Sequence, residues 1–240
     1  MSTNMSPRHS TFDAHILGSH SLHKGPLTSP VPGAETLSDF LWSATEHYRT
    51  KALNSGFVQG MVKKSLDPEG FGYYMIQDCI FTFKAKTSFD LAAQRADDVS
   101  VKQLLIKKAE DFTAYYQGLF AKWHIKDPSG IELGPECTEY VNHEQDVATH
   151  KKSIYFIVAI IPCAKLWPWI GEKIKAKVAD FGVYTRWVKE NFNPDSSAVE
   201  YEKLINAAFD LGIITKEEAL NVYEKSMKGE AEFFSSIKVD

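Results

Sequence analysis

Residues 67–85, DPEGFGYYMIQDCIFTFKA, decide the fold class of this chain. Asp67 is suited to cap a helix, Pro68 to occupy its first turn and Glu69 to face its N-terminal dipole. Apolar side chains then follow at helical spacing, from Phe71 to Ala85. The stretch therefore predicts an amphipathic α-helix that begins at Pro68 and runs to about residue 96.

Helix signals of the same kind recur along the chain. Thr36-Leu-Ser-Asp39 and Thr215-Lys-Glu-Glu218 have the spacing of capping boxes, each followed by a helical pattern. After the first box, Leu37, Leu41, Ala44 and Tyr48 lie on one stripe of a single predicted helix. Further helices are predicted at about 99–125, 136–148, 150–179 and 184–191. Alternating strand patterns are almost absent, and no internal repeat is visible. We therefore predict a single all-α domain of seven or eight helices over residues 36–240.

Residues 1–35 differ from the rest, being rich in Ser, His, Pro and Gly and poor in apolar periodicity. This composition predicts a disordered tail. The tail holds four of the eight histidines, so metal binding by it is an alternative. No ordered ligand spacing supports that alternative, and a flexible leader is the favoured interpretation.

Bulk composition excludes several classes of protein. The net charge of −4 and the lack of a basic block argue against a nucleic-acid partner. The longest apolar run, YFIVAIIPCA (155–164), is too short to span a bilayer, so no membrane partner is expected. The three cysteines, Cys79, Cys137 and Cys163, are too widely spaced for a disulfide framework or a zinc site. We expect reduced thiols and a cytoplasmic protein.

Asp78 occupies an apolar position on the first of these helices, in line with Tyr74, Met75 and Phe81. A buried carboxylate is costly unless it is paired or hydrogen-bonded. It is either a core aspartate bonded to a neighbouring tyrosine or helix end, or a group that binds a ligand.

Glu230 breaks the apolar face of the last helix in the same way, between Met227 and Phe234. An aromatic setting favours the protonated carboxyl, which suits a general acid or a proton shuttle. Fraying of the helix end, with Glu230 in solvent, is the alternative.

Cys163 lies in AIIPCAKLWPW (159–169), directly after a proline within an apolar helical run. Pro162 has no N–H, so the carbonyl of Val158 loses its usual partner and the helix should bend. Trp167 is one turn further along the same face. A thiol beside an indole could attack a flat ring stacked on that indole, although an inert buried cysteine is the common case.

Five separated motifs resemble the TenA family in order and spacing, over about residues 40–236. They are GFVQGMVKKSLDPEGFGYYMIQD (56–78), TEYVNH (138–143), IIPCAKLWPWIGEK (160–173), YTRWVKEN (184–191) and GEAEFF (229–234). This family comprises thiaminase II-like, aminopyrimidine-salvage proteins. The resemblance implies a heme-oxygenase-like helical bundle and a thiaminase II or aminopyrimidine aminohydrolase activity on an aminopyrimidine.

The resemblance also implies roles for single residues. Asp78 matches the aspartate that holds the amino-pyrimidine edge, and Cys163 matches the nucleophilic cysteine. Tyr140 matches an active-site tyrosine, and Glu230 matches the C-terminal catalytic glutamate. The mechanism it implies needs no metal and no organic cofactor. Family members also imply a homo-oligomer, a dimer or a tetramer.

Departures from the family pattern fall at substrate-binding positions. Phe81, Trp167 and Asn191 stand where tyrosines are common, and Ser55-Gly56 replaces a His-Pro pair. Two aromatic faces are kept, but three phenolic hydroxyls are lost. A lost hydrogen bond to a substrate can remove strong discrimination, so these positions bear on which ring fits.

Two other functions fit the same fold. One is a non-catalytic member that binds a small aromatic ligand, which the lost hydroxyls favour. The other is a heme or di-metal oxygenase, because one fold hosts many functions. No histidine follows His150, so the late helices offer only carboxylates to a metal. His47 is predicted beside the buried face of its helix and is the conceivable heme ligand, although a lone helical histidine is more often a surface or capped residue.

Overall fold

The computed structural model describes residues 35–193 and 197–237. The tail predicted for residues 1–35 falls, apart from Glu35, outside these residues. Ten α-helices and two 3₁₀ turns occur in the described part, and no strand is found there, so the all-α prediction is confirmed. The helices are α1 (Leu37–Ala44), α2 (Glu46–Leu53), α3 (Gly56–Lys63), α4 (Pro68–Gln94), α5 (Val99–Lys122), α6 (Pro135–His150), α7 (Ser153–Lys175), α8 (Thr185–Asn191), α9 (Ala198–Asp210) and α10 (Lys216–Ser235).

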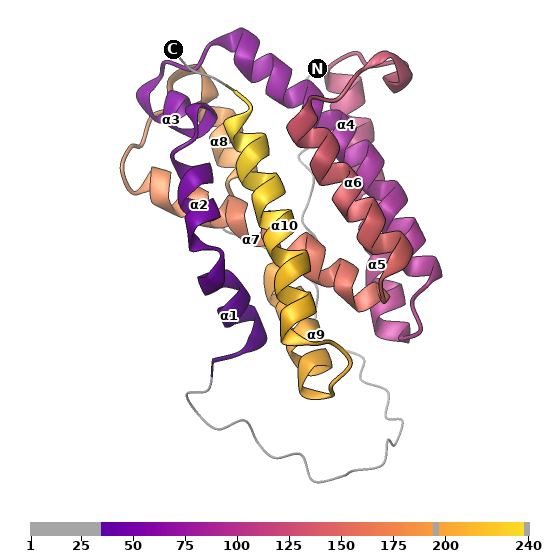
Figure 1. Ribbon diagram of the computed structural model, residues 1–240. Coiled ribbons are helices and arrows are strands. Elements are labelled where there is room, and N and C mark those ends of the chain that lie inside the picture. Colours follow the sequence, from indigo (N-terminus) through magenta and orange to yellow (C-terminus); the bar gives the residue numbers. More distant parts are fainter. Residues whose placement is uncertain (1–34, 194–196, 238–240) are drawn as a thin grey trace, which may run out of the picture. The chain divides into compact units, whose positions relative to one another are not determined.

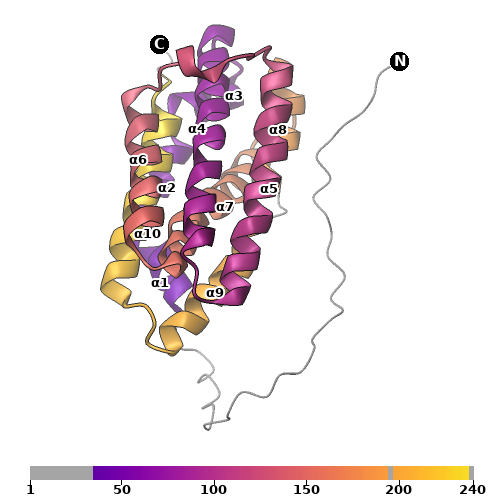
Figure 2. The same ribbon diagram turned by 90° about the vertical axis from the view of Figure 1, so that its right-hand side faces the viewer.

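Helix α10 occupies the middle of the bundle. It contacts α7, α6 and α2, and Figure 1 shows it between α1 and α2 on one side and α6 on the other. Helices α4, α5 and α6 form the neighbouring layer, in which the long α4 packs along both α5 and α6 (Figure 2). The interior of the bundle is therefore bordered by α4, α6, α7 and α10.

Local capping explains where the main helices begin. The Asp67 side chain accepts a hydrogen bond from the Glu69 N–H at 2.6 Å, as the opening stretch predicts. The capping box at Thr36 is also confirmed. At α10 only half of the predicted box forms, because Thr215 caps the Glu218 N–H while the Glu218 carboxylate pairs with Lys151 at 2.7 Å.

The predicted number of helices was too low. The expected single helix from Leu37 through Tyr48 is broken at Thr45, where the Thr45 Oγ1 donates to the Leu41 carbonyl at 2.9 Å. A hydroxyl that bonds back to its own helix competes with the backbone ladder. Helices α3 and α9 were also not predicted.

Helix α7 is the apolar core helix of the bundle. It spans 23 residues and continues through both Pro162 and Pro168. Its length and apolarity alone would suffice to cross a membrane, contrary to the argument from the shorter apolar run. However, 67% of its most apolar window is buried inside the bundle, as expected of the core helix of a soluble protein.

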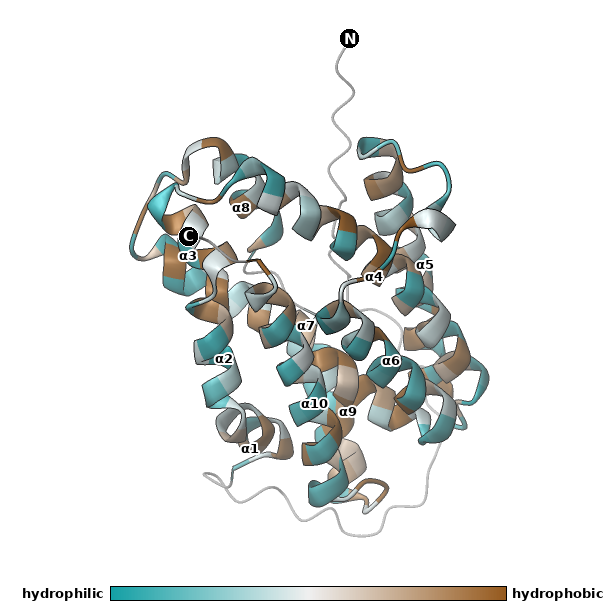
Figure 3. Ribbon diagram, turned by 45° about the horizontal axis from the view of Figure 1, so that its top comes forward, coloured by the Kyte–Doolittle hydropathy of each residue, from teal (hydrophilic) through white to brown (hydrophobic). Residues whose placement is uncertain are grey.

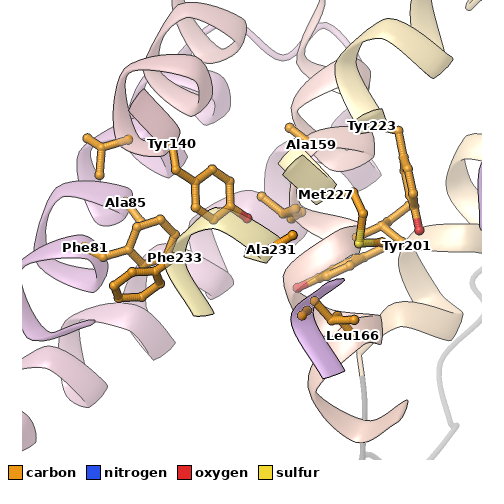
Figure 4. Packing of buried hydrophobic residues seen from close by; sticks show 14 of the residues in the cluster. Phe81, Ala85, Tyr140, Ala159, Leu166, Tyr201, Tyr223, Met227, Ala231 and Phe233 are labelled. Carbon is orange, nitrogen blue, oxygen red and sulfur yellow. The ribbon is translucent and has the colours of Figure 1, made fainter. Parts of the chain in front are cut away.

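Side-chain polarity follows the same arrangement. Figure 3 shows hydrophilic residues along the sides of α6 and α10 that face the viewer. The buried sides of the helices supply one continuous hydrophobic cluster that includes Phe81, Tyr140 and Phe233 (Figure 4). Charged side chains that are buried within this hydrophobic cluster are therefore exceptions to the pattern.

Candidate active site

Four of the predicted site residues come from four different helices. Asp78 lies on α4, Tyr140 on α6, Cys163 on α7 and Glu230 on α10. Three of the four side chains are buried, and Cys163 is half-buried. Glu230 is their common neighbour, because its charge raises the pKa of each of the other three groups.

Glu230 is the centre of this group. Its Oε1 accepts a hydrogen bond from the Tyr140 hydroxyl at 2.9 Å, and its Oε2 accepts one from the Trp167 Nε1 at 3.2 Å. The Cys163 thiol lies close enough to this carboxyl to affect its pKa. Burial raises the pKa of Glu230 from 4.5 to about 7, against the opposing effects of Tyr140, Trp167 and Cys163. The alternative of a frayed helix end is wrong, because α10 continues to Ser235 and Glu230 is only 2% exposed.

Asp78 has no cation beside it. Within residues 35–193 and 197–237 its carboxyl group forms neither an ion pair nor a side-chain hydrogen bond, so the interpretation as a bonded core aspartate finds no support there. Burial, and secondly the charge of Glu230, raise the pKa of Asp78 to about 7. A buried acceptor without a donor is costly, and a ligand carrying N–H groups would offset that cost.

Cys163 is the most accessible of the three thiols. Cys79 and Cys137 are 0% and 2% exposed, whereas Cys163 is half-buried. Burial raises the pKa of the Cys163 thiol well above its ordinary value. The charges of Glu230, Glu144 and Asp78 add to this effect, in that order. A nucleophilic thiolate therefore has to be generated by a base close to it, and Glu230 is the carboxyl whose charge affects the thiol most.

The predicted substrate-binding residues divide into two groups. Phe81 stacks on the Tyr140 ring with centroids 4.9 Å apart, and Figure 4 shows the Tyr140 hydroxyl pointing away from Phe81. Trp167 bonds to Glu230 and packs against Phe234 at 5.0 Å. Both therefore border the carboxyl groups. Asn191 instead donates its side-chain amide to the Trp187 carbonyl of its own helix at 2.8 Å.

Comparison with known proteins settles the family. The family profile described as TENA/THI-4/PQQC matches residues 42–234, which is most of the chain. The chain belongs to this family. The TenA resemblance and the heme-oxygenase-like fold are thereby confirmed.

Individual relatives of this TENA/THI-4/PQQC chain are distant. It is 23% identical to the hydroxymethylpyrimidine/phosphomethylpyrimidine kinase THI21 of Saccharomyces cerevisiae, covering 93% of this chain and 44% of that protein. It is 24% identical to the aminopyrimidine aminohydrolase of Halalkalibacterium halodurans, covering 57% of this chain and 64% of that protein. The chain thus spans less than two thirds of either relative.

Solved structures share the fold. A TenA homologue from P. horikoshii OT3 superposes with a TM-score of 0.74 at 19% identity, over 84% of this chain and 98% of that one. A putative TenA-like thiaminase from Sulfolobus solfataricus superposes with a TM-score of 0.63 at 20% identity, over 83% and 94%. At this identity the likeness concerns the fold.

Sequence reasoning missed Glu144 in this family member. It lies on α6 one helical turn beyond Tyr140 and is 3% exposed. Burial, and secondly Glu230, raise the pKa of Glu144 to about 8. Its position would have revealed it, because it interrupts an apolar face between Tyr140 and Val147, as Asp78 does on α4.

Tyr74 and Gly229 were also missed as contributors to the site. The Tyr74 hydroxyl is fully buried without a hydrogen-bond partner in the described part of the chain, one turn before Asp78. A Cβ on Gly229 would lie 2.6 Å from two ring atoms of Tyr140, so only glycine lets that ring reach Glu230.

Metal and heme ligation find little support among the described residues. No group of three or more His, Cys, Asp or Glu side chains converges there as a metal site would require. The prediction that His47 lies beside the buried face was wrong. It is exposed on α2, with its ring centroid 3.9 Å from that of Tyr48 and the two rings tilted, because the break at Thr45 separates it from the stripe of α1.

Proposed function

We propose that this protein is a TenA-like hydrolase that releases an amine or a thiazole from the 5-methylene group of a 4-amino-2-methylpyrimidine, as in thiaminase II and pyrimidine salvage. The observation that carries the proposal is the hydrogen bond from the Tyr140 hydroxyl to the buried Glu230 carboxyl, with the Cys163 thiol and the unbonded Asp78 carboxyl close by.

Asp78 would orient the ring. Its carboxylate accepts hydrogen bonds from the 4-amino group and from a protonated ring nitrogen. Binding of these donors favours the ionised form of Asp78, which in turn favours the protonated ring. A protonated ring is electron-poor and is therefore open to nucleophilic attack.

Cys163 would supply the nucleophile. Glu230 in its ionised form takes the thiol proton, and the sulfur forms a bond to the ring carbon next to the branch. The leaving amine departs from the methylene with the bonding electron pair and takes the proton from Glu230. Water then adds to the methylene, Glu230 removes the proton from that water, and the C–S bond breaks to restore the thiol. The sum is substrate plus water giving the pyrimidine alcohol plus the amine.

A direct assay tests this function. The purified protein is incubated with 4-amino-5-aminomethyl-2-methylpyrimidine and, separately, with thiamine, while the pyrimidine alcohol is followed by chromatography. We expect alcohol and ammonia in equal amounts from the first substrate, and loss of both with Asp78→Asn. Absence of product from both substrates with folded protein would contradict the proposal.

A second candidate is a non-catalytic binding protein for small aromatic ligands. The observation in its favour is that Phe81 and Trp167 pack closely against Tyr140 and Phe234 without offering phenolic hydroxyls. Calorimetric titration with the pyrimidine alcohol separates the two functions. Tight binding with no turnover of either substrate would favour this candidate.

We further propose that the protein acts in the cytoplasm as a homo-oligomer, a dimer or a tetramer, without a nucleic-acid or membrane partner. Three free thiols, two of them buried, suit a reducing compartment. The oligomeric state rests on the family resemblance alone. Light scattering coupled to size exclusion measures it, and a monomer at assay concentrations would contradict this part of the proposal.

A further inference from the structure

Tyr74 carries a buried hydroxyl group that the fold itself does not use. The side chain is 0% exposed, and its hydroxyl has no hydrogen-bond partner in the described part of the chain. Leaving a buried donor unbonded is costly, and a phenylalanine would fill the same space without that cost. The hydroxyl therefore requires a partner that these residues do not supply.

Stacked rings fix the position of this hydroxyl. The centroid of the Tyr74 ring lies 3.8 Å from that of Phe57 on α3 and 4.5 Å from that of Phe233 on α10, and the rings are close to parallel in both pairs. Phe234 stacks on Tyr74 as well, at 5.9 Å. Held among these rings, the phenol cannot turn toward solvent. Its donor is therefore available only to a group inside the bundle.

Tyr74 lies beside the acids of the candidate active site. On α4 it is one helical turn before Asp78, so the two side chains share one face of the helix. On α10 its stacking partner Phe233 comes three residues after Glu230, on the next turn. Figure 4 shows Phe233 beside Phe81, which borders the same site. The unbonded hydroxyl and the two carboxyl groups are therefore neighbours in the interior.

Tyr74 and Asp78 have opposite hydrogen-bonding needs. The hydroxyl is a donor without an acceptor, and the carboxylate is an acceptor without a donor among the described residues. A ligand that satisfies both must present N–H groups to Asp78 and an acceptor atom to Tyr74. A protonated aminopyrimidine has this pattern, because its amino group and the adjacent ring N–H form a donor edge while the second ring nitrogen keeps its lone pair.

We propose that Tyr74 is a specificity-determining residue, whose hydroxyl donates a hydrogen bond to the second ring nitrogen of the aminopyrimidine that Asp78 holds by its amino edge. This contact rests on the proposed function, since it needs a ring bound at Asp78. It supplies a phenolic hydroxyl to a site in which Phe81 and Trp167 offer none. A ring with a C–H in place of that nitrogen would leave the hydroxyl unbonded and would be disfavoured.

Two matched ligands test the contact. One is the pyrimidine alcohol, 4-amino-5-hydroxymethyl-2-methylpyrimidine, and the other is (2-amino-6-methylpyridin-3-yl)methanol, in which a C–H replaces the second ring nitrogen. Calorimetric titration gives the Kd of each ring for the wild type and for Tyr74→Phe. We expect Tyr74→Phe to weaken binding of the pyrimidine about 10-fold and to leave binding of the pyridine nearly unchanged. A ratio of the two Kd values that is the same in both proteins would overturn the proposal.

Tyr223→Phe provides the matched control. The Tyr223 hydroxyl is also buried and unbonded among the described residues, but Figure 4 shows it on the far side of Met227 from Tyr140. We expect Tyr223→Phe to leave both Kd values unchanged. If it lowered the preference for the pyrimidine as much as Tyr74→Phe does, the effect would not be specific to Tyr74 and the proposal would fail.

Asp78→Asn separates this contact from the proposed function. We expect it to weaken binding of both rings, because both present the same amino edge. If the wild type shows the Tyr74-dependent preference but turns over no aminopyrimidine, the hydrolase proposal fails and the contact stands. If the wild type hydrolyses the aminopyrimidine and Tyr74→Phe keeps the ratio of the Kd values, the contact fails and the hydrolase proposal stands. A wild type that binds neither ring would overturn both.

Discussion

Two neighbouring regions of this bundle are built on opposite principles. The carboxyl centre consists of Asp78, Tyr140, Glu144, Cys163 and Glu230. The aromatic cluster consists of Phe57, Phe71, Tyr74, Trp167, Trp187, Phe192 and Phe234, whose neighbouring ring centroids lie between 3.8 and 6.5 Å apart. Glu230 and Phe234 are one turn apart on α10, so one helix serves both regions.

The difference between the regions explains the electrostatics of the site. The aromatic cluster stabilises the fold by burying large rings. The carboxyl centre gathers three acids with no cation paired to them among the described residues, which destabilises the fold. Burial by the first region therefore keeps the acids of the second near neutral pKa, where they can exchange protons.

The largest expected effect is loss of the nucleophile in the carboxyl centre. Cys163→Ser should lower kcat/KM by at least about 1,000-fold while the fold persists, because the swap removes little volume. Steady-state kinetics on a verified substrate measures this, with Cys79→Ser and Cys137→Ser as controls that should matter far less. Full activity of Cys163→Ser would leave this residue as core packing.

Breaking the aromatic cluster should act on stability. Phe57 is fully buried and stacks on Tyr74 at 3.8 Å. Phe57→Ala should lower the free energy of unfolding by about 3–5 kcal/mol. Urea denaturation measures this. A cost below 1 kcal/mol would show that the rings repack freely and that the cluster is not a rigid wall.

Removing a carboxyl group from the carboxyl centre should increase the stability of the fold above neutral pH. Between pH 4.5 and about 7 folded Glu230 holds a proton that the unfolded chain has released, so its contribution to stability falls as pH rises through this window. Glu230→Gln should therefore be more stable than the wild type by about 3 kcal/mol at pH 8, and nearly equal to it at pH 4.

Urea denaturation of Glu230→Gln at the two pH values checks this sign. The exposed Glu139→Gln serves as the control and should show no such difference. Equal stabilities of Glu230→Gln and the wild type at pH 8 would mean that water or a counterion already neutralises the site.

The smallest expected effect on stability is at Tyr74, where the two regions meet. Its hydroxyl has no partner among the described residues, so Tyr74→Phe should change stability by less than about 1 kcal/mol or even stabilise the fold. If the hydroxyl serves a ligand beside Asp78, calorimetry should show weaker pyrimidine binding. Unchanged binding together with lower stability would place the hydroxyl in the fold alone.

Sequence patterns found part of the site and missed part for identifiable reasons. Asp78 and Glu230 were predicted because each interrupts an apolar stripe on a long helix with clear caps. Glu144 interrupts the apolar face of α6 in the same way. It was missed because it directly follows the TEYVNH motif, in which Tyr140 was taken as the site residue. Asn191 was assigned to the site because it matches a family motif. The hydrogen bond that its side-chain amide donates to the Trp187 carbonyl depends on local geometry that no sequence pattern encodes.

The fold was likewise predicted in part and missed in part. Helices α4, α6 and α10 followed from caps and periodicity. The break at Thr45 did not, because no Pro or Gly marks it. Tertiary contacts stabilise it, including a hydrogen bond from Arg49 to the Trp42 carbonyl.

Helix α10 has a further consequence for the order in which this protein is made. Asp78, Tyr140 and Cys163 all leave the ribosome before Glu230, and a domain folds as a unit once its parts are available. Until α10 docks, the Cys163 thiol lacks its main carboxyl neighbour, and its pKa lies closer to the ordinary value than in the finished fold. The nascent chain therefore passes through a period in which this thiol is more open to oxidants than it will be afterwards, and docking of α10 ends that period.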